Sequence, residues 1–261
     1  MNRIIYVPTI QHTGTWFLLE VLKMHPEVKA LIEMHLLKSI TLKGVPIPQT
    51  MYNHESFSPD GVTLVHQHIP LWEKTVGLYS PGQSMDSILF AGMVCACPTV
   101  LPLRDPLLGL LTARNRRAKN SLDLDTTFLV HIWAQTARDF MALNEVARPY
   151  YFPIDLLSKA DVGIRLACMK EMMEACWLPV DGVYLDNGHL LLSDMMVIAR
   201  EWGGVNVTKG PLDMKKQRYI DGDTEYFKEK IPAEWEELRK AEPLLRPFLE
   251  RFGYTNLLWW S

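Results

Sequence analysis

The sequence contains only four cysteines, at positions 95, 97, 168 and 176. Cys95 and Cys97 are separated by a single residue, which is the wrong spacing for a zinc knuckle, and no cluster of cysteines and histidines accompanies them. The four residues predict free, buried thiols rather than a zinc-stabilised scaffold. Free thiols fit a protein of the reducing cytoplasm.

The sequence also lacks a basic excess and a long apolar run. The 27 Lys and Arg residues against 30 Asp and Glu give a net charge of -3, so nothing implies a nucleic-acid partner. No apolar stretch is long enough for a membrane span. The first residues lack the basic region, apolar stretch and cleavage site of a secretory leader. We therefore expect a cytoplasmic protein.

The polar loop near the start of the chain also lacks a lysine. Residues 3–7 predict a buried strand and residues 16–22 an amphipathic helix. Unpaired N–H groups and the positive end of the helix dipole meet at such a helix start, which favours an anion. Gly14 is followed by Thr15 rather than by Lys, which excludes a Walker A loop and argues against a metal-dependent NTPase. The alternative is an ordinary strand-to-helix turn.

Strand and helix patterns alternate along the rest of the chain. Further strands are predicted at residues 61–67, 98–103 and 150–154, and helices at residues 107–118, 126–147, 161–177, 190–202 and 232–252, the last ended by Gly253. This alternation indicates a three-layer α/β fold with a central parallel β-sheet flanked by helices. A hydrophobic fraction of 48% suffices for the core of a single domain, residues 1–261. Residues 40–60 and 205–224 lack periodicity and predict binding loops or lids.

A second candidate anchor for an anion follows the predicted strand at residues 98–103. Arg104 stands where that strand ends, and in an α/β sheet ligands bind outside the carboxyl ends of the strands. A guanidinium fork can hold a phosphate through two hydrogen bonds. Thr112, eight residues later, reaches the same anion if a helix starts at Pro106. The alternative is a surface Arg paired with Asp105.

These two segments resemble the signature motifs of sulfotransferases that use 3′-phosphoadenosine-5′-phosphosulfate (PAPS). Thr13-Gly14-Thr15 matches the family's first loop, which holds the 5′-phosphosulfate, although His12 stands where the family has Lys or Arg. Arg104-Asp105-Pro106 with Thr112 matches the family's second motif, which binds the 3′-phosphate through an Arg and a Ser eight residues later. The resemblance implies a P-loop-NTPase-like sulfotransferase fold.

The resemblance also implies a set of residues that bind PAPS and its product, adenosine 3′,5′-bisphosphate. Thr208-Lys209-Gly210 is similar to a late loop that covers the 3′-phosphate in the family. The cofactor-binding residues implied are Gln11, His12, Thr13, Gly14, Thr15, Trp16, Arg104, Thr112, Lys209 and Gly210. The family uses no metal, and none is expected here.

Two residues are candidates for the general base that takes the proton of the acceptor. Glu33 lies in a segment that resembles one found in heparan-sulfate and tyrosylprotein sulfotransferases, whose Glu is the base. His68 lies in His66-Gln67-His68-Ile69-Pro70, which is similar to a segment of cytosolic sulfotransferases whose His is the base. The longer match favours Glu33. Lys74 matches a Lys that touches the phosphosulfate in the heparan type.

The expected activity is transfer of a sulfuryl group from PAPS to a hydroxyl or amine of a small molecule or glycan. A P-loop nucleotide or small-molecule kinase is one alternative, against which the missing Gly-Lys-Ser/Thr argues. A catalytically inactive nucleotide-binding homologue is another, because His12 replaces the family's cation. The sequence does not specify the acceptor or the oligomeric state.

Overall fold

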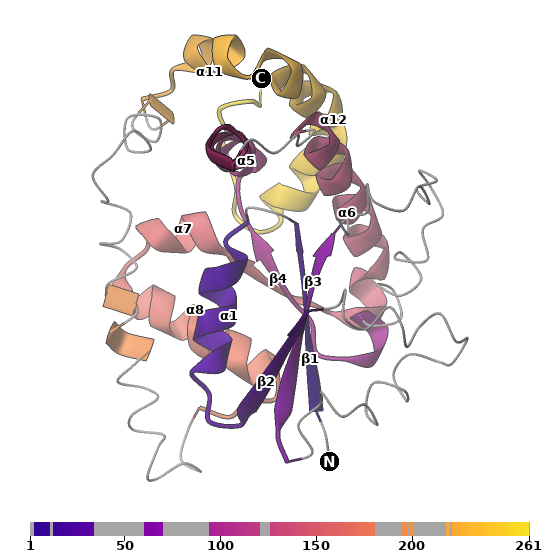
Figure 1. Cartoon of the computed structure of the whole chain (residues 1–261), viewed down its shortest axis with the longest axis vertical. Coiled ribbons are helices and arrows are strands. Elements are labelled where there is room, and N and C mark those ends of the chain that lie inside the picture. The colour runs from indigo at the N-terminus through magenta and orange to yellow at the C-terminus, as the bar shows by residue number, and fades with distance from the viewer. Residues whose placement is uncertain are drawn as a thin grey trace.

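Parallel strands and helices alternate in the structure, a computed structural model of the whole chain (Figure 1). It describes residues 3–10, 13–33, 60–69, 94–120, 126–180, 195–197, 199–200, 218–219 and 221–260. Together these residues form an α/β fold in which a small parallel sheet is flanked by helices. The α/β prediction is therefore confirmed.

The strands belong to two parallel groups that meet at one point. They are β1 (Arg3–Ile10), β2 (Val28–Glu33), β3 (Val62–Ile69), β4 (Val100–Leu103) and β5 (Tyr150–Pro153). β3 pairs with both β1 and β2, and β4 pairs with β5. A parallel bridge between Tyr6 and Thr99 joins the groups, and the Tyr6 amide donates to the Pro98 carbonyl over 2.9 Å. The strands thus follow the order β2-β3-β1-β4-β5.

Helices cover both faces of these strands (Figure 1). They are α1 (Thr15–Lys23), α5 (Pro106–Asn120), α6 (Thr126–Ala147), α7 (Ile154–Lys159), α8 (Val162–Ala175), α11 (Thr224–Lys230) and α12 (Pro232–Glu250). α1, α7 and α8 supply the core on one face, whereas α5, α6, α11 and α12 supply it on the other. In the part of the chain that the structure describes, no helix is long and apolar enough to cross a membrane.

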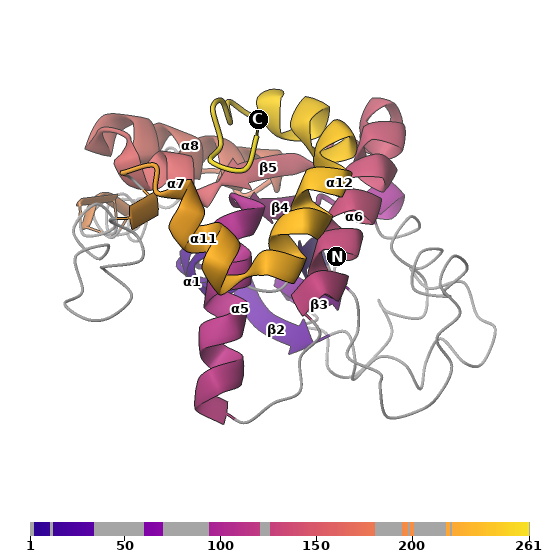
Figure 2. The ribbon, with the colours of Figure 1, turned by 90° about the horizontal axis from the view of Figure 1, so that it is seen from above.

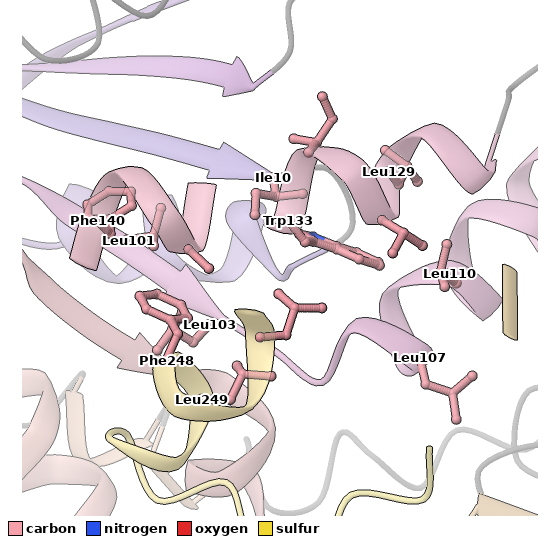
Figure 3. Close-up of a cluster of buried hydrophobic side chains, with 14 of the residues drawn as sticks. Ile10, Leu101, Leu103, Leu107, Leu110, Leu129, Trp133, Phe140, Phe248 and Leu249 are labelled. Atoms are coloured by element: carbon pink, nitrogen blue, oxygen red, sulfur yellow. The ribbon is translucent and has the colours of Figure 1, made fainter. Parts of the chain in front are cut away.

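β1 is buried on both faces because its successive side chains enter different cores. Ile4, Tyr6 and Ile10 join the core under α5, α6 and α12, which Figure 3 shows closing around β4. Ile5 and Val7 join the core under α1 and α8. A continuous apolar run is what a strand in the middle of a parallel sheet requires.

The core under α1 and α8 is rich in sulfur-containing side chains. Met169, Met172 and Met173 of α8 are fully buried there. Cys176 is buried beside them, and burial raises the pKa of its thiol to about 12. All four cysteines are free, as predicted, and Cys97 and Cys176 are buried, but Cys168 is only half-buried and Cys95 is exposed, so the prediction of buried thiols is wrong for Cys95. It lies in a short helical turn before β4.

Most of the observed elements agree with the predicted ones, and three were not predicted. β2, α7 and α11 have no counterpart among the predicted elements. The predicted end of the last helix is confirmed: Gly253 has a φ of 86°, and its amide donates to the Glu250 carbonyl over 3.0 Å. The Tyr254 amide donates to the Leu249 carbonyl over 3.2 Å, which completes a Schellman motif.

Candidate functional site

The first loop leaves β1 through a tight turn built by Thr13. Both the backbone amide and the hydroxyl of Thr13 donate to the Ile10 carbonyl, over 3.4 and 2.7 Å. Gly14 then adopts a φ of 94°, a left-handed conformation that favours glycine, and α1 begins at Thr15. The amides in the first turn of α1 have no partner within the helix. Thr13 therefore shapes the loop, and the N-terminus of α1 provides the donors.

The side chains at the start of α1 differ in exposure. Thr15 is buried, whereas the indole of Trp16 is 62% exposed. Gly14 has no side chain with which to cap the helix. An uncapped helix N-terminus carries a partial positive charge that attracts anions.

Gly14 also packs tightly against the first residue of α7. A Cβ on Gly14 would lie 2.5 Å from Cδ1 of Ile154, far closer than two carbon atoms can approach. Because α7 follows β5 directly, this contact fixes the first loop against the segment that leaves the neighbouring part of the sheet.

Arg104 and Thr112 form the second anchor, and the structure brings them together. α5 begins at Pro106, which places Thr112 two turns into the helix. Arg104 Nη1 donates to Thr112 Oγ1 over 3.4 Å, and the same hydroxyl donates to the Leu108 carbonyl over 2.9 Å. Burial lowers the pKa of Arg104, while the charges of Asp155 and Asp105 oppose that shift. An arginine in a protein nevertheless stays protonated, so the site keeps its cation.

Asp105 is a buried helix cap and not a surface partner of Arg104. Its carboxylate is 1% exposed, and Oδ1 accepts from the Leu107 amide over 3.0 Å, as an N-cap residue does. Its backbone amide donates to Oδ2 of Asp155, the second residue of α7, over 2.9 Å. Two carboxylates therefore lie together, and both act electrostatically on Arg104. Burial and the charge of Asp155 raise the pKa of Asp105 to about 7, against hydrogen bonds from Trp259 and Leu107.

This raised pKa makes the stability of the protein depend on pH. The folded state holds the Asp105 proton up to about pH 7, whereas an unfolded Asp loses it near pH 3.9. The free energy of unfolding should therefore decrease as the pH rises from about 4 to about 7. Asp105→Asn, which mimics the protonated acid, should show less of this decrease in urea titrations across that range. Parallel pH profiles for the two proteins would contradict the assignment.

The two anchors lie at the point in the sheet where a ligand is expected. From β1 the chain continues to the β2 and β3 side of the sheet, and from β4 it continues to β5 on the other side. Ligands of open α/β sheets bind at the carboxyl ends of strands where the direction of winding reverses. The first loop follows β1, and Arg104 follows β4.

The candidate bases lie on the other side of β1. Glu33 is the last residue of β2 and is in register with His66 of β3. His68 lies on β3 in register with Thr9 of β1. The side chains of Glu33 and His68 lie outside the described part of the chain. His66 is buried, and its Nε2 is 2.9 Å from the Thr9 hydroxyl.

The other predicted site residues are not placed by the structure. Gln11, His12, Lys74, Lys209 and Gly210 lie outside the described residues. In the described ranges, no three His, Cys, Asp or Glu side chains gather in a way that would hold a metal ion.

Sequence reasoning missed two groups of residues around this site. His66 could have been found, because residues two apart on a strand share a face and His66 and His68 are such a pair. Asp105 is contacted from distant parts of the chain by Asp155, Tyr219 and Trp259, and no local sequence pattern predicts these contacts. Neither a comparison with protein-family models nor one with curated proteins finds a match to this chain.

Proposed function

We propose that this protein transfers a sulfuryl group from PAPS to a hydroxyl or amine acceptor. One observation carries the proposal: a short series of contacts connects the two anchors. Gly14 packs on Ile154, and the next residue, Asp155, accepts a hydrogen bond from the amide next to Arg104. Two anion-binding elements so close together suit a ligand with two separate phosphate groups.

The chemistry of the two anchors matches the two ends of adenosine 3′,5′-bisphosphate. The start of α1 offers backbone N–H groups and a positive dipole for the 5′-phosphosulfate. Arg104 offers a guanidinium fork, and Thr112 a hydroxyl, for the 3′-phosphate. The strand order β2-β3-β1-β4-β5, with the anion loop after β1, supports the P-loop-like sulfotransferase fold that the sequence resemblance implies.

Sulfuryl transfer requires the protein to align the acceptor with PAPS and to stabilise the negative charge that develops on the leaving group. The acceptor oxygen or nitrogen forms a bond to sulfur while the bond from sulfur to the 5′-phosphate oxygen breaks. The electron pair of that bond stays on the phosphate, which leaves as part of adenosine 3′,5′-bisphosphate. The acceptor proton passes to a general base, for which Glu33 and His68 are the candidates. The helix N-terminus stabilises the charge that develops on the leaving phosphate.

Calorimetry with adenosine 3′,5′-bisphosphate, PAPS and ATP tests this proposal against its alternatives. We expect the bisphosphate to bind more tightly than ATP, with or without Mg²⁺. A preference for ATP with Mg²⁺ would instead favour a kinase. Tight binding of PAPS with no transfer to any acceptor in a broad screen would favour an inactive homologue.

Arg104→Ala should weaken binding of the bisphosphate by about 10- to 100-fold, because a two-pronged charged hydrogen bond is lost. Arg104→Lys keeps the charge without the fork and should fall between the alanine variant and the wild type. Isothermal titration of the three proteins measures the effect, and their melting temperatures show whether each is folded.

Arg138→Ala is the matched control for the loss of a positive charge. Arg138 is exposed on α6 and donates to Gln135 on the same helix. Its replacement should leave the affinity for the bisphosphate within about twofold. Equal affinities of Arg104→Ala and Arg138→Ala would remove the second anchor from the proposal.

A further inference from the structure

The segment that follows α12 returns to the site. The Schellman motif at Gly253 reverses the chain direction after α12, so that residues 254–260 fold back over the body of the protein. In Figure 2 this yellow segment lies between α7 and α12. Tyr254 and Trp259 are both fully buried as a result. We refer to residues 254–260 as the C-terminal segment.

The C-terminal segment donates hydrogen bonds to both carboxylates that act on Arg104. Trp259 Nε1 donates to Asp105 Oδ1 over 2.9 Å, and the Tyr254 hydroxyl donates to Asp155 Oδ1. The Tyr219 hydroxyl donates to the remaining oxygen, Asp105 Oδ2. With the Asp105 amide on Asp155 Oδ2, each of the four carboxylate oxygens accepts a hydrogen bond.

These hydrogen-bond donors determine whether the two carboxylates draw the Arg104 guanidinium toward themselves. A buried carboxylate without enough donors is costly and draws the nearest cation to itself. Among the described residues, Arg104 is a positive group that acts electrostatically on Asp105. When aromatic N–H and O–H groups satisfy the carboxylates, the guanidinium can instead donate to Thr112. The same donors hold Asp105, the residue next to Arg104, both directly and through Asp155, which accepts from the Asp105 amide.

We infer that the C-terminal segment is a positioning element of the anion site, with Trp259 and Tyr254 holding the Arg104 loop through Asp105 and Asp155. The importance of this loop for ligand binding rests on the proposed function. The position of the loop does not depend on the proposed function, and it can be measured without a ligand.

Trp259→Phe tests the inference, and Trp260→Phe is its matched control. Both variants exchange an indole for a phenyl ring. Trp259 loses its bond to Asp105, whereas the buried Nε1 of Trp260 has no hydrogen-bond partner in the described structure. Tyr254→Phe removes one hydroxyl with little change of shape, which covers the case in which Trp259→Phe does not fold.

Hydrogen exchange reports the position of the loop in the free protein. The Asp105 and Leu107 amides both bond to the carboxylate pair. Their exchange should accelerate by about tenfold in Trp259→Phe and Tyr254→Phe and stay unchanged in Trp260→Phe. Equal exchange in Trp259→Phe and Trp260→Phe, with no change in Tyr254→Phe, would overturn the inference.

Titration with adenosine 3′,5′-bisphosphate from pH 5 to 9 measures the affinity and the pH at which it decreases. A general loss of stability would not change that pH. At pH 5, where Asp105 is protonated, affinity should fall about three- to tenfold in Trp259→Phe and not in Trp260→Phe. Affinity should decrease as Asp105 ionises, because a second negative charge then faces Arg104 beside that of Asp155. Loss of the indole donor disfavours the carboxylate, so the midpoint of this decrease should move to higher pH in Trp259→Phe alone.

These measurements distinguish a failure of the positioning inference from a failure of the proposed function. A wild-type protein that binds no bisphosphate refutes the proposed function, and the exchange rates then decide the positioning inference alone. A wild-type protein that binds bisphosphate, with the same affinity and the same midpoint in Trp259→Phe, refutes the inference and leaves the proposed function standing.

Discussion

Replacing Gly14 with alanine should lower the free energy of unfolding by about 2–5 kcal/mol. Two independent costs add at this position. A φ of 94° strains any residue that has a Cβ, and the new methyl group would lie 2.5 Å from Cδ1 of Ile154. Either Ile154 or the first loop must move. Urea unfolding of the variant and the wild type measures the sum of the two effects.

Gly163→Ala is the matched control for this substitution. Gly163 lies in α8, and a Cβ there would meet nothing within 4 Å. This variant should be more stable than the wild type by about 0.5–1 kcal/mol, because alanine favours a helix over glycine. Similar stabilities of the two variants would show that Gly14 is neither strained nor crowded.

A double-mutant cycle with Ile154→Ala separates the two costs. Truncating Ile154 removes the close approach but leaves the backbone strain at Gly14. The combined variant should therefore lose less stability than the two single variants predict by addition. If the losses of stability are strictly additive, the whole effect of the Gly14 substitution comes from backbone strain at its positive φ.

The strand, loop and helix at the start of the chain were predictable because their signals are local. The apolar run of β1, the polar loop and the periodicity of α1 lie within one short segment. The same holds for Arg104 and Thr112, whose contact requires only that a helix begin at Pro106. Helical geometry then fixes the distance between them.

The reason for the glycine at position 14 could not be read from the sequence. A glycine in an anion loop is ordinarily explained by the close approach of a phosphate. In this structure the close approach is that of Ile154, which is 140 residues away in the chain. Packing between distant segments leaves no trace in a local pattern.

The carboxylate pair was beyond sequence reasoning for the same reason. In the sequence, Asp105 appeared only in the alternative, as the partner of a surface Arg104, but the structure buries Asp105 and bonds it to Trp259. β2 was missed because its six residues show no clear alternation of polar and apolar side chains. Its pairing with β3, rather than its composition, makes it a strand.

The strand register changes the choice between the two candidate bases. Sequence similarity favours Glu33, but Glu33 is in register with His66, which pairs with Val7 of β1, whereas His68 pairs with Thr9. Thr9 is about 7 Å farther along the strand toward the first loop than Val7. Glu33 also lies one strand farther from β1, a spacing of about 4.8 Å. The backbone of His68 is therefore closer to the proposed site of transfer.

We accordingly expect His68→Ala to lower kcat by about 10²- to 10⁴-fold, the usual contribution of a general base, while affinity for the bisphosphate stays within about twofold. Glu33→Gln should have the smaller effect. His131→Ala and Glu20→Gln, which alter exposed residues of α6 and α1, are the matched controls and should leave kcat unchanged.

The pH profile of kcat gives an independent criterion for the same assignment. A histidine base loses activity as the pH falls through about 6.5, whereas an ordinary glutamate base remains active to about pH 4.3. An acid limb near 6.5 that disappears in His68→Ala would identify His68 as the base. If Glu33→Gln abolishes turnover and His68→Ala does not, an acceptor bound along β2 must reach the base, and the register argument fails. If neither variant slows transfer, the base lies elsewhere, and His66, hydrogen-bonded to Thr9 on the same strand pair, is the next residue to replace.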